Sequence, residues 1–133
     1  MKSKINPSSL LSSLWVFILL NMLFRDMHQF ANKGFMQELL TIDVSEEILL
    51  IAGMVLEIPI LMVVLSRVLK PKLNKWVNIV AAGITVLSMI GTLSSPDLDD
   101  IFFMIVESLA FVTIVIVARN LPGSSYRMTK ERL

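Results

Sequence analysis

The chain has 133 residues, 55% of them hydrophobic and 17% charged, with a mean hydropathy of +0.74. Soluble domains carry about 25% charged residues, so this composition excludes an ordinary soluble protein and indicates a single integral membrane domain. The absence of cysteine excludes disulfides, thiolate chemistry and iron–sulfur clusters, and the single histidine, His28, argues against a multi-histidine metal site or haem. We expect no cofactor, no metal and no nucleic-acid partner.

Four long apolar stretches predict four membrane-spanning helices. They cover about residues 8–29, 46–69, 74–93 and 96–119. Two lysines precede the first apolar stretch, as basic residues precede the apolar region of a signal peptide. However, Arg25-Asp26-Met27-His28 ends its apolar run, where a cleavage site needs small residues, so we expect an uncleaved helix. Residues 30–45 carry apolar side chains at helical spacing, which predicts a short amphipathic segment at the membrane interface.

Helix-start and helix-stop residues delimit the later spans. Asp43 and Glu46 have the spacing of a capping box, which predicts the start of the second span. Residues 70–72 predict its end, because they contain a proline, which cannot continue a helix. Residues 94–96, two serines and a proline, predict the start of the fourth span.

Charge alternates between the ends of the predicted spans. The N-terminal tail, residues 67–75 and the C-terminal tail are basic, whereas residues 25–47 and 94–100 are mainly acidic. The positive-inside rule therefore places both termini in the cytoplasm. Trp15 and Trp76 fall near the cytoplasmic boundary, which indicates interfacial anchors. The predicted fold class is all-α, a four-transmembrane-helix bundle in up-down-up-down order with a short interfacial segment between its first two helices.

Two glutamates, Glu57 and Glu107, lie inside predicted spans. Each is about eleven residues from the start of its span, or ~16 Å at 1.5 Å per residue, so both are expected near mid-membrane. A charged carboxylate there costs about 2.5–3.5 kcal/mol on insertion scales, so neither is expected to face lipid. The two spans run in the same direction, so the carboxylates are expected at matching depth in one shared site. Pro59 should kink the helix beside Glu57.

The first span supplies candidate partners for the glutamates. Asn21, Arg25 and His28 share one helical face, and the long Arg25 side chain could bring a cation to a carboxylate. The predicted ligand-binding residues are Glu57, Glu107, Arg25, Asn21, His28 and Asp26. Plainer interpretations stay open: the glutamates could only hold the bundle together, and Arg25 with Asp26 could be a solvated helix end. Thr85, Ser88 and Thr92 likewise indicate either helix packing or a polar path.

Several of these positions carry a family resemblance. Glu57-Ile58-Pro59-Ile60 and Asn74-Lys75-Trp76-Val77-Asn78-Ile79, with Asp26-Met27-His28 before them and Glu107 after, resemble small four-helix prokaryotic membrane proteins of unknown function over about residues 10–120. The resemblance implies the four-helix fold and a prokaryotic cytoplasmic membrane. It also supports Asp26, His28, Glu57 and Glu107 as site positions, but it implies no activity and no substrate.

The expected function is a non-enzymatic site for a small molecule, lipid or proton in an outward-opening polar pocket. One alternative is an accessory or scaffold subunit with purely structural glutamates, whose face around Gly83 and Gly91 contacts a membrane partner or a second copy. Another is an intramembrane enzyme that uses the two carboxylates as acid and base. Membrane lipids are expected partners in every case.

Overall fold

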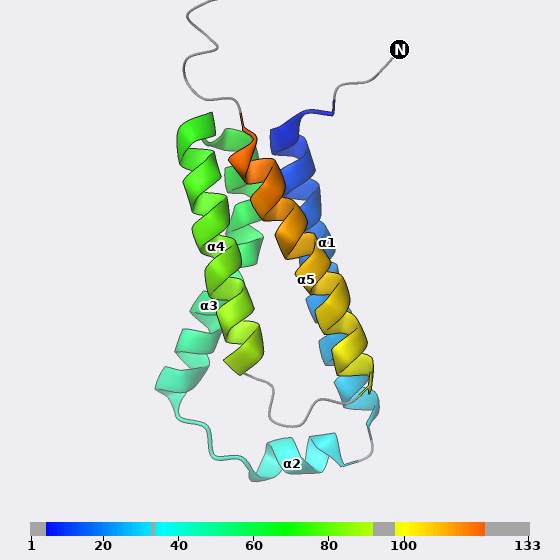
Figure 1. The fold of residues 1–133 in the computed structure, drawn as a ribbon. Coiled ribbons are helices and arrows are strands. Elements are labelled where there is room, and N and C mark those ends of the chain that lie inside the picture. Colours follow the sequence, from blue (N-terminus) through cyan, green and yellow to red (C-terminus); the bar gives the residue numbers. More distant parts are fainter. Residues whose placement is uncertain (1–4, 33, 92–97, 122–133) are drawn as a thin grey trace, which may run out of the picture.

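The computed structural model describes residues 5–32, 34–91 and 98–121, and every regular element in these ranges is a helix (Figure 1). The helices are α1 (Pro7–Ala31), α2 (Phe35–Thr41), α3 (Glu46–Val68), α4 (Pro71–Gly91) and α5 (Leu98–Arg119). By length and composition, the four long helices could each cross a membrane, whereas α2 has only 7 residues. The prediction of an all-α chain with four long apolar helices is confirmed.

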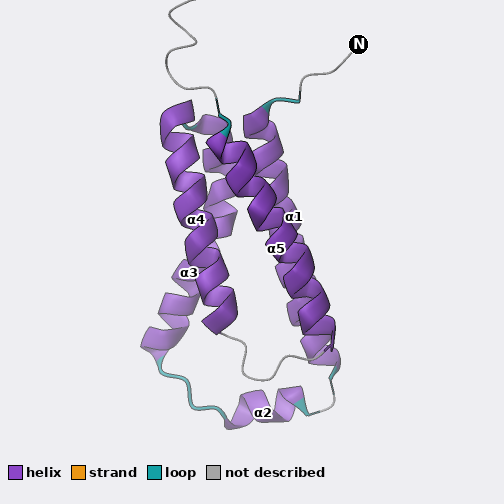
Figure 2. Ribbon diagram, viewed as in Figure 1, coloured by secondary structure: helices purple, strands orange, loops and turns teal. Residues whose placement is uncertain are grey.

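Proline and asparagine explain how two helices begin. The Asn6 side-chain oxygen accepts a hydrogen bond of 3.0 Å from the Ser8 backbone N–H, and Pro7 occupies the first position of α1. Pro71 opens α4 similarly, about three residues before the predicted start. A two-residue turn therefore joins α3 to α4, so these helices must lie side by side (Figure 2).

The predicted capping box before α3 is wrong. Such a box needs its glutamate at the third helical position, but Ser45 holds the N-cap position and Glu46 is already the first helical residue. Ser45 makes no capping bond with its side chain. The helix start predicted at residues 94–96 lies outside the described residues.

Each long helix packs against two neighbours. α1 contacts α3 and α5, and α4 contacts the same two helices. α3 and α5 are therefore diagonally opposite in the described structure, with no close backbone contact between them. Figure 1 shows the start of α1 and the end of α5 at one end of the molecule, with α2 lying across the other. We call these the terminal end and the α2 end.

Apolar side chains cover the outside of the long helices, and polar side chains occupy much of the inside. Leu87 on α4 and Leu109 on α5 are exposed, whereas Ser66, Asn78 and Glu107 are fully buried. In water, exposing so many apolar side chains would be unfavourable. In a lipid bilayer it is not, because an apolar side chain surrounded by hydrocarbon gains little by turning inward. The distribution agrees with four helices that could lie in a membrane.

A hydrogen-bonded cluster around Asn78 holds the terminal end together. Trp15 on α1 donates its indole N–H to Asn78 Oδ1 at 2.7 Å, and the Ser66 hydroxyl on α3 donates to the same oxygen at 3.1 Å. The Asn78 amide donates to the backbone and side-chain oxygens of Asn74 at 2.8 and 2.6 Å. Asn74 Nδ2 in turn donates to the Ser66 backbone oxygen at 2.7 Å. One asparagine side chain thus links three helices.

The interfacial role predicted for Trp15 is wrong. Its side chain is 0% exposed and its ring packs edge-on against Phe111, with the ring centroids 6.1 Å apart. The indole N–H that would face lipid headgroups is instead committed to Asn78. Trp76 on α4 is exposed, so its interfacial role stays a prediction.

The packing loosens from the terminal end towards the α2 end. Residues 46–54 of α3 are all exposed, and the buried residues of α3 begin at Pro59. Figure 1 shows the α3–α4 pair diverging from the α1–α5 pair in the same direction. α3 continues through Pro59 as one helix, and the predicted kink there stays a prediction. In this looser half, polar side chains of α1 and α5 pair with each other.

Replacing Asn78 with leucine should destabilise the protein, because Trp15 and Ser66 lose a shared buried acceptor. Interhelical hydrogen bonds in membrane proteins contribute about 0.6 to 1.7 kcal/mol each, so we expect a loss of about 1–3 kcal/mol in the free energy of unfolding. Unfolding in mixed micelles with increasing dodecyl sulfate measures it. Asn21→Leu is the matched control, since within the described structure the Asn21 amide donates only to Phe17 O of its own helix. Equal stability of the two variants would contradict the role given to Asn78.

Candidate functional site

A buried ion pair joins α1 to α5 at the point where the bundle begins to open. Arg25 Nη1 lies 3.3 Å from Glu107 Oε2, and the two groups satisfy hydrogen-bond geometry. Glu107 is 0% exposed and Arg25 is 8% exposed. Glu107 lies about 14 Å from the start of α5 at 1.5 Å per residue, which places it well inside the helix. The predicted role of Arg25 as the cation for an intrahelical glutamate is therefore borne out for Glu107.

Helical periodicity explains why both side chains point inward. On α1, Leu11, Ile18 and Arg25 recur every seven residues and are all buried. On α5, Glu107, Phe111 and Ile114 fall on one buried face at spacings of four and three. Arg25 and Glu107 thus continue two apolar stripes that already face each other.

One oxygen of Glu107 lacks a partner. Oε2 faces Arg25, but Oε1 is buried and accepts no hydrogen bond from any described residue. Buried polar atoms in folded proteins almost always have a partner, so an orphan acceptor requires an explanation. A bound hydrogen-bond donor, a water molecule or a proton on the carboxyl group would each provide one. The ion pair with Arg25 satisfies only one of the two carboxyl oxygens of Glu107.

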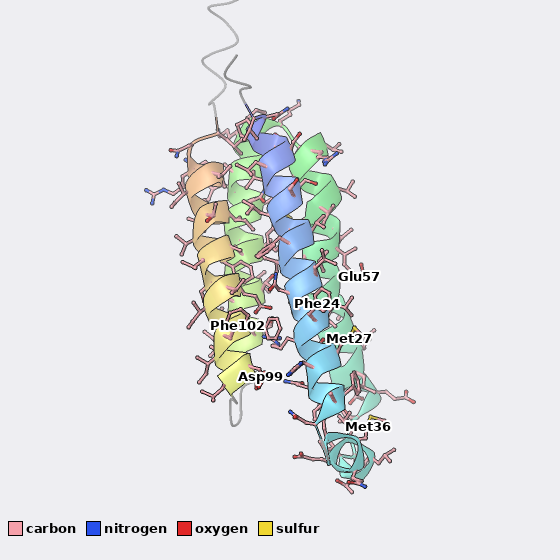
Figure 3. The ribbon with its side chains drawn as sticks, turned by 90° about the vertical axis from the view of Figure 1, so that its right-hand side faces the viewer. Phe24, Met27, Met36, Glu57, Asp99 and Phe102 are labelled. Atoms are coloured by element: carbon pink, nitrogen blue, oxygen red, sulfur yellow. The ribbon has the colours of Figure 1, made fainter. Side chains whose placement is uncertain are left out.

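Two further polar pairs connect α1 and α5 on the α2 side of Glu107. Gln29 Nε2 donates to Asp100 Oδ1 at 3.3 Å, and His28 Nε2 lies 3.5 Å from Asp99 Oδ2. The His28 side chain is exposed and the Asp99 side chain is partly exposed, so their pair adds little stability. Figure 3 shows Asp99 near the lower end of α5, beside α1. We call the three pairs, with Arg25–Glu107 innermost, the polar ladder.

The two aspartates of the polar ladder, Asp99 and Asp100, are not among the residues predicted for the site, because their charges indicate an acidic loop that sets orientation. Their spacing from Glu107 carried a usable signal, because Asp100 lies seven residues before it and shares its helical face. On α1, Gln29 is likewise four residues after Arg25, which repeats the stripe on the opposing helix.

Glu57 does not join this site, so the predicted pairing of the two glutamates is wrong. Glu57 is exposed, because Pro59, Met62 and Ser66 form the buried face of α3 and Glu57 lies about 200° around the helix from Pro59. α3 is also diagonally opposite α5. In Figure 3, α1 lies between α5 and Glu57. Matching depth along two helices does not bring side chains together when both rotation and neighbour order separate them.

The remaining predicted residues have separate surroundings. The Asn21 amide donates to Phe17 O at 2.9 Å within its own helix, and Asp26 is exposed. Of the hydroxyl stripe on α4, Thr85 and Ser88 also donate to backbone oxygens of their own helix, at 2.8 Å each, which favours helix packing over a polar path. Thr92 lies outside the described residues. An outward-opening pocket at Glu107 stays a prediction.

The Arg25–Glu107 pair makes a double-mutant prediction. Removing one member of a buried ion pair leaves the other charge uncompensated, which typically costs about 3–5 kcal/mol, whereas replacing both by apolar groups costs far less. We therefore expect Arg25→Leu and Glu107→Leu each to lower the free energy of unfolding in micelles strongly. The double variant should be more stable than either single variant. Strictly additive losses would show that the two side chains do not interact.

Comparison with known proteins agrees with the resemblance in one respect, that the matching family has no known function. Neither the curated proteins nor the solved structures compared with this chain give a match. A family model does match, over residues 2–122, a range that includes all five described helices and every residue of the polar ladder. The chain belongs to this family, which is described as a family of unknown function, DUF6326.

Proposed function

We propose that this chain is an integral protein of a prokaryotic cytoplasmic membrane whose four spans cross in up-down-up-down order. Both termini lie in the cytoplasm, and α2 lies in the outer interface. Two observations support this orientation. Five of the six described lysines and arginines lie at the terminal end, where α3 ends, α4 begins and α5 ends: Arg67, Lys70, Lys72, Lys75 and Arg119; the sixth is Arg25. The α2 end carries acidic helix starts on both α3 and α5.

Within this arrangement, Glu107 binds a hydrogen-bond donor inside the membrane. The donor is an ammonium or hydroxyl group of a small molecule or lipid; alternatively, Glu107 binds a proton directly and becomes a neutral carboxylic acid. The orphan Oε1 atom carries the proposal, because a fully buried acceptor without a protein partner is the feature that a donor would satisfy. Arg25 keeps the other oxygen in place. The function is binding, with no chemical reaction required.

The polar ladder provides a path by which a polar ligand or a proton reaches Glu107. Its outer pairs, His28 with Asp99 and Gln29 with Asp100, extend from the partly exposed α2 end to Glu107 along one helix–helix contact. Polar groups along such a line lower the cost of bringing a polar ligand or proton to mid-membrane depth.

The two alternatives receive different support. The acid–base enzyme used Glu57 and Glu107 together, and the exposed position of Glu57 removes that support. The accessory or scaffold subunit keeps one favourable observation. Gly83 and Gly91 are exposed, with open space where a Cβ atom would stand, so a partner helix could approach them closely. A scaffold does not explain the orphan oxygen of Glu107.

Glu107→Gln tests the binding proposal while preserving a partner for Arg25. A glutamine amide has one oxygen, which Arg25 requires, so its NH2 group takes the place of the orphan acceptor and turns the site from acceptor to donor. We expect dodecylammonium to raise the thermal unfolding midpoint of the wild type by a few degrees and to have no such effect on Glu107→Gln. Dodecyltrimethylammonium has the same charge and chain but no N–H donor, and it should stabilise neither protein.

Glu57→Gln is the control variant, because it makes the same chemical change on the exposed face of α3 and should respond like the wild type. Infrared spectroscopy covers the case in which the ligand is a proton. A carboxylic-acid C=O band that depends on pH should then persist in Glu57→Gln and vanish in Glu107→Gln. If neither a donor-specific stabilisation nor a band from Glu107 is observed, Glu107 is purely structural and the proposal fails.

A further inference from the structure

A second feature, independent of Glu107, is an open groove between α1 and α3 near the terminal end. Its volume is about 500 Å³. Its apolar walls are formed by Val16, Val63, Val64 and Val68, and its polar groups come from Ser12, Ser13 and Arg67. Because Arg67 and Val68 are the last residues of α3, the groove runs from the helix end towards the middle of the span.

Arg67 is held in a fixed position at the mouth of this groove. The Ser12 hydroxyl donates to Val63 O at 2.7 Å and accepts from Arg67 Nε at 2.9 Å. Ser12, on α1, therefore bonds to two groups of α3, the Val63 carbonyl and the Arg67 guanidinium, and holds the guanidinium against the helix. The two terminal nitrogens of Arg67 form no hydrogen bond with a described residue, which leaves a planar set of donors available.

Among the described residues, the charges near the groove are all positive. Lys70 and Lys72 follow within five residues of Arg67, and the nearest acid along α3 is Glu57, about 15 Å away at 1.5 Å per residue. Arg67 therefore has no described carboxylate competing for its free donors. A guanidinium fork matches the oxygen geometry of a phosphate, and the valine walls match an acyl chain.

We propose that this groove binds one anionic phospholipid of the membrane leaflet at the terminal end. The phosphate accepts hydrogen bonds from the terminal nitrogens of Arg67, and an acyl chain lies along Val16, Val63 and Val64. The occupant follows from position and charge. The groove lies on the outer surface of helices that could cross a membrane, its cation is in the last turn of α3, and a negatively charged leaflet attracts such a cation.

Native mass spectrometry of protein from micelles containing equal amounts of phosphatidylglycerol and phosphatidylcholine, with identical acyl chains, tests this site. We expect the wild type to retain phosphatidylglycerol preferentially and Arg67→Gln to lose about fivefold or more of that retention. Arg119→Gln is the matched control. It removes an exposed arginine from the same end of the molecule, but on α5, which does not contact α3.

A second variant separates the groove from the charge. Val64→Phe fills the space for the acyl chain and leaves Arg67 unchanged, so it should also reduce phosphatidylglycerol retention. Equal losses in Arg67→Gln and Arg119→Gln would show diffuse attraction to a basic end and overturn the proposal. Unchanged retention in Val64→Phe would overturn it as well, since no chain would then occupy the groove.

Discussion

Helices surrounded by lipid cannot be held together by turning apolar side chains inward, so their contacts depend on packing and on polar groups that pair inside. The cluster around Asn78 meets this requirement for the present chain. One side-chain oxygen accepts hydrogen bonds from α1 and α3, and the same amide group bonds within α4. No buried side-chain donor or acceptor of this cluster lacks a partner in the described structure. The terminal end is therefore fixed, and the rest of the bundle extends from it.

The α2 end lacks a comparable cluster among the described residues. There α3 exposes nearly all of its side chains, and α1 and α5 are joined by the polar ladder. Glu107 lies between these two regimes, buried like the Asn78 cluster but incompletely paired. The end with satisfied polar groups holds the position of Glu107 in the bundle. Glu107 is fully buried, so the proposed ligand reaches it only through local opening, and the looser α2 end is where such opening costs least.

The sequence was sufficient to predict the long helices and to predict that Arg25 pairs with a glutamate. Long apolar runs and proline positions locate the spans, and the burial cost of a charge predicts that Arg25 meets a glutamate. The sequence could not decide which glutamate, since depth along a helix says nothing about which helices are neighbours. Trp15 shows the same limit. Its distance from the helix end resembles that of an interfacial anchor, but its rotation about α1 turns it towards Asn78. Both errors concern rotation and neighbour order, which depend on tertiary packing.

The proposed binding function depends on Glu107 Oε1 being paired with a bound ligand, water or proton and not with another group of the protein. An experimental structure in lipid nanodiscs, at a resolution that shows ordered water and lipid, tests it most directly. The account predicts non-protein density within hydrogen-bonding distance of Glu107 Oε1, with Arg25 on Oε2 and Glu57 on the outer face of α3. If protein groups pair both oxygens of Glu107 in a dry, closed core, the claim is contradicted and the carboxylate is a structural element.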